Sequence, residues 1–550
     1  MKANNLISYN IILLLLLFQM ILPLIWLAVL VAVLALYFRR VYSSFNREGI
    51  KHFKPVPLLG NLGSLLLRKE HFCDHIINLY KSFPEERFVG RYEFLKQVIV
   101  VRDLELIKKM TVKDFEHFLD HQSMFDTGDS YFSRNLFALR GQEWKDMRST
   151  LSPAFTSSKM RLMLPFMVEV GNQMMQMLHQ KIRESKNGTI TIDCKDLTTR
   201  YANDVIATCA FGLKVDSQTD KTNSFYMLGK ESSDFGIRKL LTFLIASSSP
   251  ALAKLLKLDF LSEESKKGFK KIVLDTMQNR EMKDIIRPDM IHLLMEAKKG
   301  RLTHEEDKTN DVAAGFATVQ ESAVGKKMTD RVWTDDDLVA QAVLFFIAGF
   351  ETVSTGMVFL LYELAVNSDI QERLAQEIRE TDAKNGGKFD FNSIQNMVYM
   401  DMVVSEALRL WPPAVTLDRI CTKDYNMGKP NPKSEKDFIL RKGTGVWIPA
   451  YAFHRDPQYF PNPDKFDPER FSEENKHTIN PFAYMPFGVG PRNCIGSRFA
   501  LCEIKVMVYQ ILKEMVLSPS ETTCIPAKFS KESFSMRLDG GHWLKFSPRY

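Results

Sequence analysis

A long uncharged run near the N-terminus, residues 11–38, constrains the fold of this chain more than any other feature. A helix needs about 20 predominantly apolar residues to cross a bilayer, and this run exceeds that length. The apolar region of a cleaved signal peptide is shorter, about 7–15 residues, and small residues follow it at the cleavage site. Here the run ends at Arg39 and Arg40 instead. It therefore predicts a retained membrane anchor over residues 1–40.

The charges that flank this run indicate its orientation. Five basic residues follow it within residues 39–54, whereas only Lys2 precedes it. Basic residues gather on the cytosolic side of a membrane span. Pro55 and Pro57, at alternate positions, then predict a stiff extended linker over residues 41–61. The remainder, residues 62–550, is expected to be one catalytic domain in the cytosol.

The composition excludes several classes of protein. A hydrophobic content of 45% and a charged content of 25% are typical of a globular protein with a substantial core. The net charge of +7 comes from scattered residues, so no concentrated basic face predicts a nucleic-acid partner. The seven cysteines are widely spaced and form no C-x-x-C pair, which argues against a zinc ribbon or a disulfide scaffold.

The hydrophobic pattern predicts a mainly α domain with a minor β component. Apolar residues recur at three- and four-residue spacing through residues 160–182, 338–366, 370–381 and 498–515. Short strand-like segments cover residues 88–92, 98–101 and 189–192, and a hairpin is predicted over residues 438–448. The polar stretch at residues 301–330 lacks periodicity and is expected to be a surface connection.

One stretch, FGVGPRNCIG at residues 487–496, combines a lone cysteine with three glycines. The glycines allow the backbone to turn tightly and to approach something flat. A helix is predicted to start near Cys494, and its N-terminal dipole would favour the thiolate. A thiolate without a second protein ligand suits an axial bond to haem iron, and Arg492 could pair with a haem propionate. A buried structural cysteine is the alternative.

This stretch resembles the haem-binding loop of cytochrome P450 monooxygenases. The resemblance implies haem b as cofactor, with Cys494 as the axial ligand of the iron. Phe487, Gly488, Arg492 and Gly496 would form the cofactor-binding loop around it. It also implies the family's fold, a large helical domain with small β-sheets around a buried haem, here preceded by a transmembrane helix.

A second motif, AGFET at residues 348–352, lies in the middle of the predicted helix over residues 335–366. Thr334 and Asp337 form a capping box at its start. Ala348 and Gly349 would leave room above a planar cofactor, and the Thr352 hydroxyl could admit water to the helix. In the family this motif lines the oxygen-binding side, which makes Glu351 and Thr352 the expected catalytic residues. An ordinary core helix is the alternative.

Further motifs follow in the family's order. By resemblance, Trp144 and Arg148, four residues apart, would contact a haem propionate, and Arg419 matches another propionate-binding arginine. Glu406 and Arg409 would join Arg470 in a buried network that supports the haem from beneath. On sequence alone each of these pairs could equally be a packing or surface pair.

The resemblance covers essentially the whole chain and is closest to membrane-bound insect enzymes associated with detoxification. It implies a monooxygenase that uses O2 and NADPH to oxidise a lipophilic small molecule. The expected partners are NADPH–cytochrome P450 reductase, cytochrome b5 as a further electron donor, and the endoplasmic reticulum membrane, with no nucleic acid. Apolar candidates for the substrate pocket are Phe346, Phe350, Val353, Val415 and Phe534.

Three other functions are consistent with parts of the sequence. Glu116, His117 and His121 could begin a metal site, although a third ligand in a known pattern is missing. A membrane-anchored haem sensor would need Cys494 but not Glu351 and Thr352. An enzyme that rearranges peroxides would also dispense with that acid–alcohol pair.

Overall fold

The computed structural model describes residues 2–122, 131–233, 237–300, 315–322, 324, 333–387 and 389–549. The α-helices are α1 (Lys2–Tyr42), α2 (Ser44–Arg47), α3 (Gly63–Leu66), α4 (Phe72–Lys81), α5 (Leu104–Lys108), α6 (Gly141–Leu151), α7 (Ser157–Glu184), α8 (Cys194–Ile206), α9 (Ser224–Ser233), α10 (Ile237–Ser248), α11 (Pro250–Leu255), α12 (Glu263–Lys283), α13 (Met290–Lys298), α14 (Asp335–Val366), α15 (Ser368–Lys384), α16 (Phe391–Gln395), α17 (Val398–Leu410), α18 (Ala450–Phe453) and α19 (Ser497–Glu514). The strands are β1 (Phe88–Glu93), β2 (Lys96–Val101), β3 (Ile190–Asp193), β4 (Leu417–Ile420), β5 (Tyr425–Asn426), β6 (Ile439–Leu440), β7 (Gly445–Ile448), β8 (Met515–Pro519) and β9 (Trp543–Pro548). The mainly α fold predicted from the sequence is confirmed.

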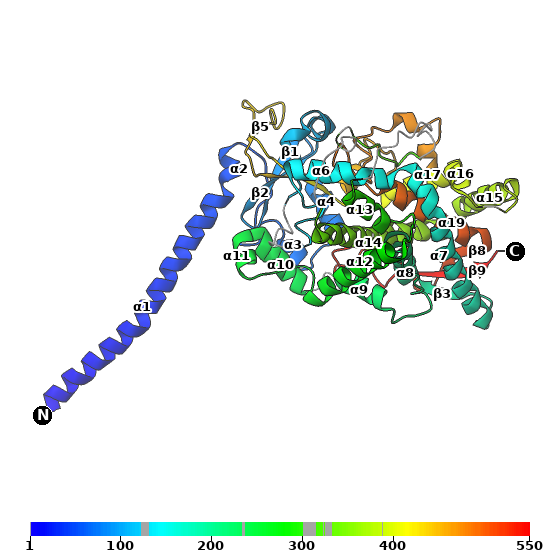
Figure 1. Cartoon of the computed structure of the whole chain (residues 1–550). Coiled ribbons are helices and arrows are strands. Elements are labelled where there is room, and N and C mark those ends of the chain that lie inside the picture. Colours follow the sequence, from blue (N-terminus) through cyan, green and yellow to red (C-terminus); the bar gives the residue numbers. More distant parts are fainter. Residues whose placement is uncertain are drawn as a thin grey trace.

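The N-terminal helix α1 extends away from the rest of the chain (Figure 1). Its segment Phe18–Tyr42 has a mean hydropathy of 2.7, none of it buried, and is long enough to span a membrane. Arg39 and Arg40 lie in its last turn. The helix runs two residues past the predicted end of the anchor, because the charged last turn still forms regular helix.

Three small sheets accompany the helices. The largest has the strand order β1-β2-β7-β4, with β2 and β7 parallel and the other neighbours antiparallel. Strands β3, β9 and β8 form the second sheet, and β5 and β6 pair as the third. The predicted hairpin over residues 438–448 is therefore wrong. Both strands exist, but β6 pairs with β5 and β7 lies between β2 and β4.

The linker differs from the predicted extended form. Val56 and Gly60 form an isolated bridge around a tight turn in which Leu58 has a φ of 68°. His52 and Gly60 also bridge to β1. The first part of the predicted linker is helical, since α1 ends at Tyr42 and α2 spans Ser44–Arg47. The part around Pro55 and Pro57 is not helical, and backbone hydrogen bonds to β1 hold it against the domain.

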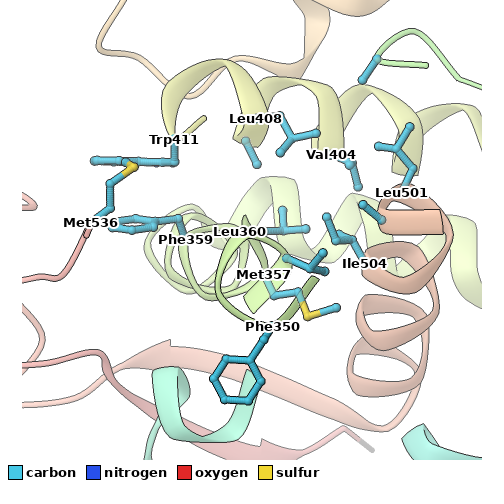
Figure 2. Packing of buried hydrophobic residues seen from close by; sticks show 14 of the residues in the cluster. Phe350, Met357, Phe359, Leu360, Val404, Leu408, Trp411, Leu501, Ile504 and Met536 are labelled. Atoms are coloured by element: carbon cyan, nitrogen blue, oxygen red, sulfur yellow. The ribbon is translucent and has the colours of Figure 1, made fainter. Parts of the chain in front are cut away.

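Helix α14 is the central element of the core. The predicted capping box is confirmed, because the Thr334 side chain accepts from the Asp337 backbone and the Asp337 side chain accepts from Thr334. Figure 2 shows residues of α17 and α19, among them Val404 and Leu501, converging on Met357 of α14. This packing fixes α14 relative to α19, which follows the cysteine loop directly.

Candidate active site

The cysteine loop, residues 487–496, is held by its own backbone. The Cys494 N–H donates to the Phe487 carbonyl at 2.8 Å, and the Asn493 N–H donates to Gly490 at 3.0 Å. Gly490 has a φ of 74°, and a Cβ there would lie 2.0 Å from the Thr111 carbonyl oxygen. No other residue fits that position. Helix α19 starts at Ser497, so Cys494 lies just before its first turn.

The environment of Cys494 differs from the expected stabilised thiolate. Burial raises the pKa of its thiol, while the Gly496 backbone N–H and the charge of Arg148 act in the opposite direction. Yet the side chain is exposed, unlike those of Cys73, Cys194 and Cys502. A thiol that water can reach, but that protein atoms surround, lies on the wall of an internal space.

Two residues of the AGFET motif open onto internal space as well. Ala348 and Thr352 are exposed, although most residues of α14 as a whole are buried. The helix is continuous through the motif, and the Thr352 hydroxyl donates to the Ala348 carbonyl. The predicted room beside Ala348 is therefore present without a break in the helix.

Gly349 and Glu351 lie on other faces of α14. A Cβ on Gly349 would be 2.9 Å from Ile206 of α8, so this glycine allows close packing between the two helices. Its predicted place beside a cofactor stays a prediction. Glu351 faces Lys195 of α8, with Oε1 3.2 Å from the lysine Nζ.

A haem fits the residues around this space. The ring of Phe155 lies 5.3 Å from that of Phe345 in α14, and 3.9 Å from the position of a Cβ on Gly496. One side chain thus contacts both α14, which carries Ala348 and Thr352, and the cysteine loop, which carries Cys494. We infer that these three residues open into one space between the two elements, where a planar group would cover all three.

Three arginines predicted to hold the propionates lie together. Burial and the charges of Arg419 and Arg148 hold the pKa of Arg492 well below its usual range. Arg492 also stacks over Trp144, with its guanidinium carbon 4.1 Å from the ring centroid. Nearby carboxylates of Asp120 and Asp418 offset part of this positive charge. Three guanidinium groups gathered in one place suit contacts with anionic propionates.

The same arginines also make protein contacts that the sequence did not indicate. Arg492 donates to the carbonyls of Leu119 and Leu139 at 2.7 and 2.6 Å. Arg148 donates to the Asn493 carbonyl and side-chain oxygen, both at 2.8 Å. Such hydrogen bonds fix the direction of each guanidinium, and short-range spacing in the sequence could not have revealed them.

The predicted support network is brought together. Arg409 donates to both carboxylate oxygens of Glu406, at 2.7 and 2.8 Å, and both side chains are fully buried. Arg470 lies 3.4 Å from the same carboxylate. A buried, bidentate pair of this kind is costly to break, because one charge would remain without its partner.

Lys195 was missed by the sequence analysis. It is almost fully buried, donates to Ser354 and Thr355 at 2.8 and 3.2 Å, and pairs with Glu351. Burial lowers its pKa to about 8. Arg537 lies 3.6 Å from the same glutamate oxygen. No local motif marks Lys195, since its partners are far away in sequence.

A cleft of about 1920 Å³ borders Glu351 and Lys195. Phe350 and Phe534 also line it, whereas Cys494 and the exposed face of α14 do not. The cleft is therefore separate from the surroundings of Cys494. The exposed cysteine identifies the candidate site, and the size of the cleft does not. The remaining pocket candidates belong to the core, as Phe346 illustrates, because its ring packs on Phe211, Phe225 and Phe269.

The alternative metal site receives no support. Among the described residues, no three His, Cys, Asp or Glu side chains lie together as metal ligands would. His121 instead pairs with Asp418 at 3.0 Å and stacks on Phe137. His121 therefore adjoins the arginine cluster, a placement that its sequence neighbours could not indicate.

Comparison with known proteins agrees with this site. The family model for Cytochrome P450 matches residues 51–544. The chain is 47% identical to cytochrome P450 9e2 of Blattella germanica over 521 residues, which cover 92% of this chain and 94% of that protein. It is 41% identical to probable cytochrome P450 9f2 of Drosophila melanogaster over 527 residues, 94% of this chain and 97% of that one. The chain therefore belongs to the cytochrome P450 family of haem-thiolate monooxygenases, oxidoreductases that bind haem b.

Proposed function

We propose that this chain inserts one oxygen atom from O2 into a lipophilic small molecule, with electrons from NADPH delivered by NADPH–cytochrome P450 reductase. The observation that carries the proposal is the exposure of Cys494, Ala348 and Thr352 in two elements that are otherwise largely buried. A thiolate on one side and a hydroxyl on the other are what an oxygen-activating haem site requires.

The predicted cofactor-binding residues have separate roles in holding the haem. Cys494 would bind the haem iron, and Arg148, Arg419 and Arg492 would hold the propionates, with Trp144 packed against Arg492. Phe487, Gly488 and Gly496 shape the loop that carries the ligand. When bound, haem supplies the activation of oxygen, and the protein supplies the ligand, the cavity and the protons.

Proton delivery falls to Thr352 and Glu351. The Thr352 hydroxyl is bonded to the Ala348 carbonyl and reaches the internal space, where it can hold a water molecule. Glu351 borders the adjacent cleft, between Lys195 and Arg537. Together the two side chains connect water in the cleft with the interior.

The substrate is proposed to be a lipophilic xenobiotic or an endogenous lipid or hormone. Aromatic side chains at Phe350 and Phe534 give the cleft apolar surface, and Glu351, Lys195 and Arg537 give it charged surface. We further propose that α1 anchors the enzyme in the endoplasmic reticulum, where the reductase and cytochrome b5 can reach a cytosolic domain. The uncovered apolar helix supports this placement.

The carbon-monoxide spectrum of the reduced protein tests the haem ligand. We expect the red-shifted Soret band of thiolate-ligated haem, and Cys494→Ser should abolish it. Cys502→Ser is the matched control, since Cys502 is fully buried in α19 and should leave the band intact. A band that persists in Cys494→Ser would rule out this ligand.

A further inference from the structure

Residues 315–322, here called the strap, pack against the domain as part of the core. They belong to the polar stretch that was expected to be a surface connection; residues 301–314, 323 and 325–330 of that stretch lie outside the described part. Ala317 is only 3% exposed. Phe316 packs its ring on Phe471 and Tyr484, with centroids 5.0 and 5.4 Å away. The strap therefore lies beside the segment that leads into the cysteine loop.

The start of the strap is anchored to α17 and α19. The Phe316 N–H donates to Asp401 of α17 at 2.8 Å, and the other oxygen of Asp401 pairs with Lys505 of α19 at 2.9 Å. Gly315 has a φ of 91°, and a Cβ there would lie 2.2 Å from Asp401 Oδ1. This glycine lets the backbone approach the carboxylate closely.

The end of the strap reaches the residue next to Cys494. The Gln320 carbonyl accepts from the Asn493 side chain at 3.0 Å. Glu321 forms a bidentate pair with Arg148, with contacts of 2.6 to 3.2 Å, and Arg148 is 4% exposed. Since Arg148 also donates to Asn493, these four residues form one network around the cysteine loop.

We propose that the strap fixes the cysteine loop, and that Glu321 is a positioning residue that acts on Cys494 through Arg148 and Asn493. The proposal rests on the proposed role of Cys494 as haem ligand. Glu321 would act in two ways. It holds the guanidinium that holds the loop, and its negative charge offsets part of the positive charge that Arg148 places near the haem site.

The negative charge of Glu321 should affect the midpoint potential of the haem, which a purely structural role would leave unchanged. A positive charge near a redox centre favours its reduced form, so neutralising Glu321 should shift the midpoint potential to more positive values. We expect about a threefold or larger increase in the equilibrium constant for reduction in Glu321→Gln. Glu321→Asp, which keeps the charge, should stay closer to the wild type.

The experiment uses the full chain with haem in membranes. The midpoint potential is measured, together with the rate at which the reduced, carbon-monoxide-bound protein loses its thiolate band in mild denaturant. Glu116→Gln is the matched control. Glu116 pairs at 2.7 Å with Lys145, which lies in α6 as Arg148 does, and this pair is partly exposed to solvent. Gly315→Ala tests the other end of the strap through steric conflict with Asp401.

We expect Glu321→Gln and Gly315→Ala to lose the thiolate band about threefold faster than Glu116→Gln or more, and only Glu321→Gln to shift the potential strongly. If Glu321→Gln and the control agree in both measurements while the wild type shows the thiolate band, the strap proposal is wrong and the proposed function stands. If the wild type itself lacks the band, the proposed function fails and the strap proposal fails with it.

Discussion

At the scale of single residues, neighbours in one motif have separate environments. Glu351 faces Lys195 and the cleft, whereas Thr352 is exposed on the side of the internal space. The sequence placed both together as an acid–alcohol pair. The two side chains point in different directions because consecutive residues of a helix are rotated about its axis. On the proposed proton route, water in the cleft at Glu351 would have to reach Thr352 around α14.

Replacing Thr352 tests the proposed proton route. Thr352→Ala removes the hydroxyl that is bonded to Ala348 and changes little volume, so haem content and the thiolate spectrum should survive. Without the hydroxyl, protons reach bound oxygen less efficiently, and we expect NADPH consumption to continue while product falls several-fold and peroxide rises. The measurement is the ratio of product to NADPH with saturating substrate and reductase.

Thr352→Ser is the control, because it keeps a hydroxyl at the same position. We expect it to retain most of the coupling. An unchanged ratio of product to NADPH in Thr352→Ala would mean that protons travel by another route.

The site residues that the sequence predicted lie in local motifs, whereas those it missed have partners far away in the sequence. Cys494 and Thr352 lie in short motifs whose residue types are dictated locally. Lys195 and Glu321 act through partners more than a hundred residues away, Glu351 and Arg148, and such pairs leave no local pattern. The sequence therefore predicted the motif residues of the site but not their supporting contacts.

At the scale of elements, the helices were predicted closely and the strand partners were not. The bounds of α14 agree with its capping box and apolar periodicity, which are local properties. The pairing of β6 with β5, and of β7 with β2 and β4, depends on contacts across the chain. Proximity in sequence suggested a hairpin because hairpins are the simplest way to pair adjacent strands.

A buried carboxylate in α14 makes the packing of this helix depend on pH. Glu363 accepts a hydrogen bond from the Trp411 indole at 2.8 Å, and Trp411 stacks on Phe359 (Figure 2). Burial raises the pKa of Glu363 from 4.5 to about 7. Because the folded protein holds this proton more tightly, the contribution to stability is fully present below pH 4.5 and is lost as the pH rises through 7.

Glu363→Gln should remove this dependence, since the amide oxygen can still accept from Trp411 but cannot ionise. We expect the variant to be more stable than the wild type near about pH 8.5, by at most about 3 kcal/mol, and similar near about pH 5. The measurement is the thermal midpoint at both pH values. Glu473→Gln, on the surface, is the control and should change neither. Equal differences at the two pH values would contradict the assignment.

At the scale of the whole molecule, the charges beside the anchor predict on which side of the membrane the domain lies. Helix α1 projects from the domain (Figure 1), and its last residue, Tyr42, packs on Tyr92 of β1. Its apolar surface is uncovered, and its basic end joins the domain at Arg39 and Arg40. The length and charge of this segment predicted the helix from the sequence, because both are local properties. Its orientation in the membrane stays a prediction.

Asn187 offers a test of that orientation. It begins an Asn-Gly-Thr glycosylation acceptor, and it is exposed in the turn between α7 and β3. The fold would therefore not block glycosylation of Asn187 if the domain lay in the lumen. If the basic residues after α1 keep the domain in the cytosol, as the charge bias predicts, Asn187 never meets the glycosylation machinery. We expect no mass shift on glycosidase treatment of the protein expressed in eukaryotic cells. An Asn-x-Thr tag added ahead of Met1 should be modified instead, and a glycosidase-sensitive shift that Asn187→Gln removes would reverse the proposed topology.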